Sequence, residues 1–151
     1  MISIRSATGE DIPRIIDLYD KLSIGTTRLE MERNPSPEDY LAVFEDIQAD
    51  PGHELLVAEE DGEVKGSVVL LVVPNLSHRA TPWALVENLI VDPGNRQKGI
   101  GRMLLEHVVE LAKRRGCHRV EVMSDRRRVE AHRLYQSVGF EPSAYGFRLF
   151  F

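Results

Sequence analysis

A loop with two closely spaced glycines restricts the fold of this chain more than any other feature. Arg96-Gln97-Lys98-Gly99-Ile100-Gly101-Arg102 stands between a predicted strand at 83–91 and a predicted helix. The unpaired N–H groups and the positive dipole end at the start of a helix favour a phosphate group. Glycines let such a group approach the backbone closely. The sequence therefore predicts a strand, an anion-binding loop and a helix in direct succession.

The other segments alternate between helical and strand patterns, as is typical of an α/β protein. Helix starts are indicated by capping signals, and the turn of a hairpin is indicated by Asp61-Gly62. The predicted elements are a strand at 2–5, helices at 8–22 and from 36 to near 50, a hairpin at 54–73, a helix after the glycine loop, a strand at 119–123, a helix at 130–138 and a final strand through Phe147, Leu149 and Phe150. These elements predict a mixed central sheet with helices on both faces.

Length, composition and charge exclude several classes of protein. The 151 residues suffice for one domain, expected to span 1–151, and 42% apolar with 28% charged residues are typical of globular proteins. The longest apolar run, 67–73, is too short to cross a membrane, and no signal peptide is evident, so we expect a cytoplasmic protein without a membrane partner. A net charge of −5 argues against broad nucleic-acid binding. The single cysteine, Cys117, and the spacing of His and carboxylate residues indicate neither a disulfide nor a metal site.

The glycine spacing distinguishes the loop from two common nucleotide-binding motifs. A Walker-type loop ends in Gly-Lys-Ser or Gly-Lys-Thr, whereas Gly101 is followed by Arg102 and Met103. A dinucleotide fingerprint has three glycines in the first strand–helix unit, but here the third glycine is missing and the unit comes late. By itself a glycine pair also fits a plain turn, so its interpretation depends on what surrounds it.

Three motifs in a fixed order provide that context. They are Glu87-Asn88-Leu89-Ile90-Val91-Asp92-Pro93, Arg96-x-x-Gly99-x-Gly101, and Ala131-x-x-Leu134-Tyr135-x-x-x-Gly139-Phe140. This succession resembles the GNAT-type N-acetyltransferase superfamily over nearly the whole chain. The resemblance implies an α/β fold with a mixed sheet of about six to seven strands and about four helices. It also implies an acyltransferase that uses acetyl-CoA as the donor.

The resemblance further implies where acetyl-CoA binds. The N–H groups of Gln97, Lys98, Gly99, Ile100, Gly101 and Arg102 would hold the pyrophosphate, and the pantetheine arm would lie along Leu89, Ile90 and Val91. Arg96 and Lys98 would add positive charge, which raises the affinity for a diphosphate.

Arg128 departs from the family pattern. Many relatives have an asparagine at this place, which hydrogen-bonds the pantetheine, so Arg128 is a candidate cofactor contact of a different chemistry. With Arg126 and Arg127 it would alternatively touch the CoA phosphates or an anionic group on the acceptor. A run of charges in a loop is also often simply solvated.

Two residues are candidates for proton transfer. Tyr135 matches the tyrosine that in similar enzymes can protonate the departing thiolate, although a tyrosine on a helix can also be a packed aromatic side chain. Glu87 precedes the point where the family's strand commonly bulges, where a carboxylate can remove a proton from the acceptor amine. A solvent-facing strand residue, with a chain of waters as the base, is the alternative.

The acceptor is less constrained than the donor. Residues 128–135 and 143–148 are similar to members that act on small amines, including aminoalkylphosphonate acetyltransferases. We therefore expect direct transfer to a primary amine of a small molecule, with acetylation of a protein or peptide, or a non-catalytic acyl-CoA sensor, as alternatives. The early helices and the loop at 75–82 are expected to shape the acceptor groove. Dimerisation is common in the family, and exposed strand ends would support a homodimer.

Overall fold

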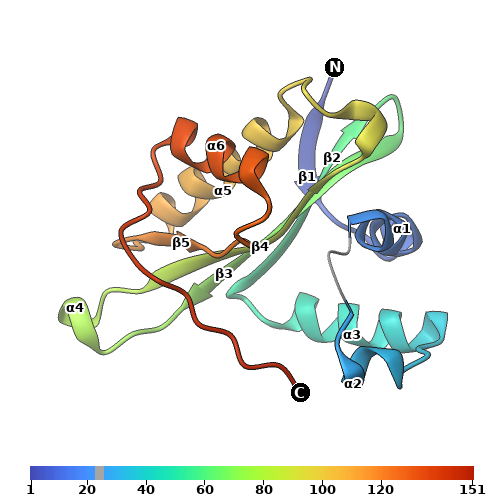
Figure 1. Cartoon of the computed structure of the whole chain (residues 1–151), viewed down its shortest axis with the longest axis horizontal. Coiled ribbons are helices and arrows are strands. Elements are labelled where there is room, and N and C mark those ends of the chain that lie inside the picture. Colours follow the sequence, from blue (N-terminus) through green and yellow to red (C-terminus); the bar gives the residue numbers. More distant parts are fainter. Residues whose placement is uncertain (23–25) are drawn as a thin grey trace.

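The computed structural model describes residues 1–22 and 26–151, and its centre is a five-stranded mixed sheet (Figure 1). The strands follow one another in space as they do in sequence: β1 (Ser3–Ser6), β2 (His53–Glu60), β3 (Glu63–Val73), β4 (Trp83–Val91) and β5 (Val120–Val122). The first four pair antiparallel, and β5 pairs with β4 in parallel. The predicted hairpin at 54–73 is confirmed as β2 and β3.

The predicted helices are present and begin where the capping signals place them. They are α1 (Ile12–Leu22), preceded by a short 3-10 helix η1 (Gly9–Asp11), α3 (Pro37–Ala49), α5 (Ile100–Arg114) and α6 (Val129–Val138). The Asp11 carboxylate accepts a hydrogen bond from the Thr8 N–H (2.7 Å), and Ser36 and Asp39 bond each other reciprocally ahead of α3. Two short helices that were not predicted, α2 (Arg28–Met31) and α4 (Ser77–Ala80), lie between these elements.

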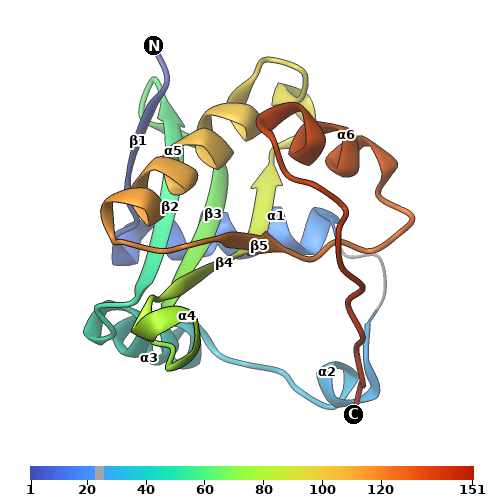
Figure 2. The same ribbon diagram turned by 90° about the vertical axis from the view of Figure 1, so that its left-hand side faces the viewer.

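Helices cover both faces of the sheet, as predicted. Helices α1 and α3 lie on one face, and α5 and α6 lie on the other (Figures 1 and 2). Alternate strand residues point to opposite faces, so the molecule has two apolar cores. One core contains Val68, Leu70 and Val86 with Leu104 and Val108 of α5, and the other contains Val57 and Val69 with Ile15 and Leu18 of α1.

Strand β4 bulges at the place where the sequence predicted an irregularity. Ser67 of β3 pairs with Ile90, whereas Val69 pairs with Glu87, so β4 has one residue more than β3 over this stretch. Asn88 lies in this stretch with a φ of 51°, in the left-handed region. A bulge bends a strand and re-aims its side chains. Because β4 and β5 pair only at 84–86, the two strands part where the bulge begins.

The predicted final strand is wrong. Residues 139–151 contain no strand, and the sheet of the described residues has five strands rather than about six to seven. The apolar side chains of this segment are exposed. Tyr145, Phe147, Leu149 and Phe151 stand at alternate positions and are 82–93% exposed, and Phe150 between the last two is 63% exposed. Alternation predicts a strand, but a strand forms only against the backbone of another strand. Instead the segment finishes beside α2 (Figures 1 and 2).

Candidate active site

The glycine loop begins with a turn that ties the end of β4 to α1. The turn is the short 3-10 helix η2 (Pro93–Asn95), and the Asp92 carboxylate accepts hydrogen bonds from the Gly94 N–H (3.4 Å) and from the guanidinium of Arg14 (2.6 Å). The Asp92 N–H donates to the carbonyl of Lys65 (2.8 Å). These bonds fix the direction in which the chain leaves the sheet.

The start of α5 presents unpaired backbone donors. Gly99 is the N-cap, and its carbonyl accepts from the N–H of Met103 (3.0 Å), so the N–H groups of Ile100, Gly101 and Arg102 precede the first helical bond. Gln97 and Gly99 have φ values of 65° and 80°, which turn the backbone just before the helix. Successive N–H groups in such a conformation form a concave site for an anion. The geometry therefore fits the diphosphate that the sequence predicted here.

The two glycines of the loop are required for different reasons. Gly99 has a left-handed φ, and a Cβ there would meet nothing within 4 Å. Gly101 lies in the helix, and a Cβ there would lie 3.2 Å from Leu134 Cδ2 of α6 and 3.6 Å from Val91 Cγ2 of β4. Gly99 is therefore needed for backbone conformation, and Gly101 for close packing of α5 between β4 and α6.

The cations of the loop have separate surroundings. Arg96 and Lys98 are exposed, and Lys98 Nζ donates to the Asn95 side chain (3.2 Å). The guanidinium of Arg102 instead bonds Glu106 (2.8 Å) and the Ser137 hydroxyl (3.1 Å), which joins α5 to α6. Arg102 can therefore contribute its N–H to an anion while its side chain holds two helices together.

The two predicted proton-transfer residues are both withdrawn from solvent. Glu87 is half-buried on β4, and burial raises the pKa of its carboxyl group. Tyr135 of α6 is only 9% exposed, and burial raises the pKa of its phenol, while the charge of Arg128 and a hydrogen bond with Ser124 lower that pKa and the charge of Glu87 raises it. Glu87 and Arg128 therefore both lie close enough to Tyr135 to act on its titration.

A cavity of about 630 Å³ opens beside the bulge. It is bounded by described residues from α1 to the start of α3, by the bulged part of β4 and by the start of α6. Its lining consists of Tyr19, Asp20, Thr26, Glu30, Arg33, Pro35, Tyr40, Asn88, Leu89, Ile90 and Arg128. Of the predicted cofactor residues it contains Leu89, Ile90 and Arg128. Ile90 is 4% exposed and its side chain packs with the α1 core, so its backbone is the part open to a ligand.

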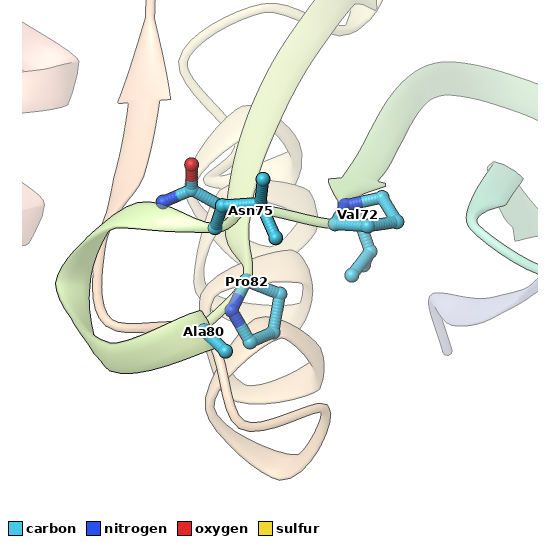
Figure 3. A pocket seen from close by; sticks show the side chains of 6 residues that line it. Val72, Asn75, Ala80 and Pro82 are labelled. Carbon is cyan, nitrogen blue, oxygen red and sulfur yellow. The ribbon is translucent and has the colours of Figure 1, made fainter.

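The loop before β4 lies at a different place from the one expected. It lines a separate hollow of about 480 Å³, formed by Val72, Pro74, Asn75, Leu76, Ala80 and Pro82 (Figure 3). His78 in this loop stacks on His118, with ring centroids 4.1 Å apart. None of these residues lines the cavity beside the bulge. Both the early helices and this loop were expected to shape one groove. Of these two, only the early helices contribute residues to the cavity beside the bulge.

Sequence reasoning missed several lining residues of the larger cavity. Tyr19 and Tyr40 have helical spacing, which is also typical of side chains on the apolar face of a helix. Arg33 lies in a segment without a motif, and Asn88 was counted only as part of the strand. Among these lining residues, Asn88 alone carried a signal in the sequence. Asparagine tolerates a positive φ, and Asn88 has one in the structure.

The family is decided by a match over most of the chain. The sequence model of the acetyltransferase (GNAT) family matches residues 16–140. The chain belongs to the GNAT family of acetyltransferases. GNAT enzymes use acetyl-CoA, so the protein is an acetyl-CoA-dependent acyltransferase, and the concave run of N–H groups at the start of α5 suits this donor.

Individual GNAT relatives agree with this assignment. The chain is 27% identical to an L-methionine sulfoximine/L-methionine sulfone acetyltransferase of Salmonella typhimurium, over 95% of this chain and 82% of the relative. It is 31% identical to an aminoalkylphosphonate N-acetyltransferase of the same organism, over 72% of each. Its fold is similar to that of a Bacillus halodurans protein described as a transcriptional regulator, with 30% identity, full coverage of both chains and a TM-score of 0.90.

Among residues 1–22 and 26–151, no helix has the length and apolarity that a bilayer crossing requires. Within the same ranges, no three His, Cys, Asp or Glu side chains gather as ligands of a metal ion.

Proposed function

We propose that the protein transfers the acetyl group of acetyl-CoA directly to a primary amine of a small molecule. One observation carries the proposal: the half-buried Glu87 lies at the bulge of β4, near enough for its charge to act on the buried phenol of Tyr135, and the bulged stretch of β4 lines a cavity. A donor held by the loop and an acceptor held in the cavity would meet at this point. Positioning of two reactants in this way accounts for a large share of catalysis.

The donor would be held mainly by backbone groups. The N–H groups from Gln97 to Arg102 would bind the pyrophosphate, with the exposed Arg96 and Lys98 adding charge. The arm would follow β4 at 89–91, a stretch that lies beyond the pairing of β4 with β5 at 84–86. When bound, acetyl-CoA supplies an activated thioester, and a strand N–H near Leu89 would donate a hydrogen bond to its carbonyl oxygen.

Glu87 would act as the base. An amine is protonated at neutral pH and attacks only after it has lost a proton. Burial raises the pKa of Glu87 toward the range in which a carboxylate can accept and release a proton efficiently. The carboxylate would take the proton directly or through one water.

Tyr135 would act as the acid. Burial disfavours the phenolate, so the hydroxyl keeps its proton at neutral pH and can give it to a leaving thiolate. The nearby charge of Arg128 counteracts part of the rise in the pKa, which makes the release of the proton easier. The hydrogen bond with Ser124 would orient the hydroxyl.

The acceptor class is supported by the relatives and by the size of the cavity. The names of the two Salmonella relatives denote small compounds that carry an amine together with an acidic group. A cavity of about 630 Å³ is the size of a small-molecule site. A peptide acceptor or a non-catalytic acyl-CoA sensor remain the competing functions, and the name of the Bacillus halodurans protein favours testing the sensor.

A single experiment separates these functions. Release of the CoA thiol from acetyl-CoA is followed with amino acids, aminoalkylphosphonates, polyamines, simple alkylamines and short peptides, while acetyl-CoA binding is measured by calorimetry. Turnover with a small amine is the expected result. Turnover with peptides alone would identify a protein acetyltransferase, and tight acetyl-CoA binding without turnover would identify a sensor.

We also propose that the protein forms a homodimer through its C-terminal segment. Tyr145, Phe147, Leu149 and Phe151 alternate and are exposed, and β5 pairs with β4 alone among the described strands, so its other edge is open. An open edge and an apolar strand pattern in the same chain are complementary to those of a second copy.

A further inference from the structure

Arg128 differs from the two arginines that precede it. Arg126 and Arg127 are exposed, and Arg127 is bound to the Asp125 carboxylate through its guanidinium (2.8 Å) and its N–H (2.9 Å). Arg128 is half-buried and lines the cavity beside the bulge. Among the ion pairs found within residues 1–22 and 26–151, none includes Arg128. A half-buried guanidinium without a carboxylate partner is open to an anion from outside the chain.

The backbone around Arg128 is fixed even though its side chain is open. Arg128 is the N-cap of α6, its N–H donates to the carbonyl of Asp125 (3.0 Å), and its carbonyl accepts from the N–H of His132 (3.2 Å). Its position relative to Tyr135 is therefore set by one rigid helix. A change in its side chain leaves these backbone bonds in place.

The charges of the cavity are arranged unevenly. One side contributes Asp20 of α1, Glu30 of α2 and Arg33, which follows α2. The Glu30 carboxylate already accepts a hydrogen bond from the Thr27 N–H (2.6 Å) as part of a helix cap. On the side of the cavity that faces α6, Arg128 is the single charged residue among the described lining residues. An anion entering beside Tyr135 therefore meets a cation there.

We infer that the acceptor carries an acidic group close to its amine, and that Arg128 binds this group while Glu87 faces the amine. The acidic group is a carboxylate, a phosphonate or a phosphate, each of which presents the paired oxygens that a guanidinium binds with two parallel hydrogen bonds. The inference rests on the proposed function and gives it a substrate class. It also gives Arg128 a role at the acceptor in place of the predicted contact to the cofactor.

The arrangement explains why an arginine at this place would select the acceptor. Arg128 lines the cavity from the start of α6, and the carboxylate of Glu87 lies on the bulged strand β4, whose residues 88–90 line the same cavity. An acceptor with one positive and one negative group complements this pair. An acceptor without the acidic group would leave the guanidinium unpaired, and an unpaired buried charge is costly.

The test compares matched acceptors on matched variants. The acceptors are an α-amino acid and the amine that lacks its carboxylate, and an aminoalkylphosphonate and the alkylamine of equal length. The variants are Arg128→Gln, Arg128→Lys and, as a control on an exposed neighbour, Arg126→Gln. Arg128→Gln is expected to lower kcat/KM about 10- to 150-fold for the acid-bearing acceptors. The acid-free amines are expected to lose only what the charge of Arg128 contributes at Tyr135, so the preference for the acid-bearing member of each pair falls in the variant. For the acid-bearing acceptors, the kcat/KM of Arg128→Lys is expected to lie between the values of the wild type and Arg128→Gln. The kcat/KM of Arg126→Gln is expected to equal that of the wild type.

Several outcomes would overturn the inference. One is an equal loss for both members of an acceptor pair, which would mean that Arg128 acts through Tyr135. Another is a higher Kd for acetyl-CoA in Arg128→Gln together with an unchanged preference between acceptors. That result would make Arg128 a contact to the cofactor, as the sequence predicted. If no amine is turned over, the proposed function fails by itself. Calorimetric binding of the acceptor pairs to the CoA complex of wild type and Arg128→Gln then tests the inference, and equal binding to both proteins would overturn it.

Discussion

The donor side and the acceptor side of the site are built in different ways. The donor side is one continuous segment, from Asp92 to Arg102, and its features are backbone features: left-handed φ values, a helix start and N–H groups without helical partners. The acceptor side is assembled from side chains of three separated regions, with Tyr19, Tyr40 and Arg128 among them. On the proposed assignment, cofactor binding is encoded mostly by a local segment, whereas acceptor recognition depends on tertiary packing.

The largest expected effect tests the point where the two sides meet. Tyr135→Phe removes the hydroxyl but keeps the ring, which is 9% exposed and packed in the core. We expect kcat to fall by about 10³-fold, within the range for general acid catalysis, with the acetyl-CoA Kd nearly unchanged. Steady-state kinetics and calorimetry measure the two quantities. An unchanged kcat would mean that Tyr135 is only a packed aromatic side chain.

A smaller effect is expected at the carboxylate. Glu87→Gln should lower kcat/KM by about 10²-fold, at the low end for acid–base catalysis, because water can partly replace the base. The base works only when ionised, so activity falls as the pH drops through its pKa. Burial raises the pKa of Glu87, so the acidic limb of the wild-type profile should lie above that of an exposed glutamate. The variant should lack this limb. Its persistence in Glu87→Gln would assign it to a water chain or another group.

Most of the fold followed from the sequence because its signals are local. The capping residues Ser36 and Asp39, the hairpin turn and the glycines Gly116 and Gly139 each determine the structure within a few residues. The bulge of β4 was placed correctly just after Glu87 from the family pattern. The final strand failed because its apolar alternation satisfies only one requirement of a strand, while the other, a pairing edge, is not a property of the segment.

The acceptor cavity could not be predicted for a related reason. Tyr19 and Tyr40 have the spacing of core residues, and nothing in their own helices distinguishes a side chain that lines a cavity from one that fills a core. The role of Arg128 depends on Asp125 being engaged by Arg127, which appears only in three dimensions. Side-chain sites formed between distant segments therefore need the structure, whereas the backbone site at the start of α5 did not.

A matched pair of glycines isolates the backbone contribution on the donor side. Gly99 and Gly116 have φ values of 80° and 78°, and a Cβ at either would meet nothing within 4 Å. Gly99→Ala and Gly116→Ala should each lower the free energy of unfolding by about 1 kcal/mol, which would appear as similar drops in Tm. Only Gly99→Ala is expected to weaken acetyl-CoA binding, by about tenfold, because it reorients the N–H groups at the helix start. Calorimetry on both variants decides this. Equal acetyl-CoA affinities would mean that the loop does not hold the donor.

The smallest expected effect on catalysis concerns the C-terminal segment, which belongs to neither side of the site. Removal of residues 145–151 takes away the exposed row of alternating apolar side chains and none of the lining of the cavity. Sedimentation should show a dimer for the full chain and a monomer after truncation, with kcat within about twofold of the wild type.

Point variants sharpen this test of the segment. Phe147→Ser with Leu149→Ser should also give a monomer, whereas Arg148→Ser, on the opposite side of the alternating pattern, should leave the dimer intact. A monomeric full chain would remove the proposed dimer. A dimer that survives truncation would place the contact elsewhere. In either case the exposed side chains would have to be stabilised by something other than a second copy, since an apolar row of this length is rarely left open to water.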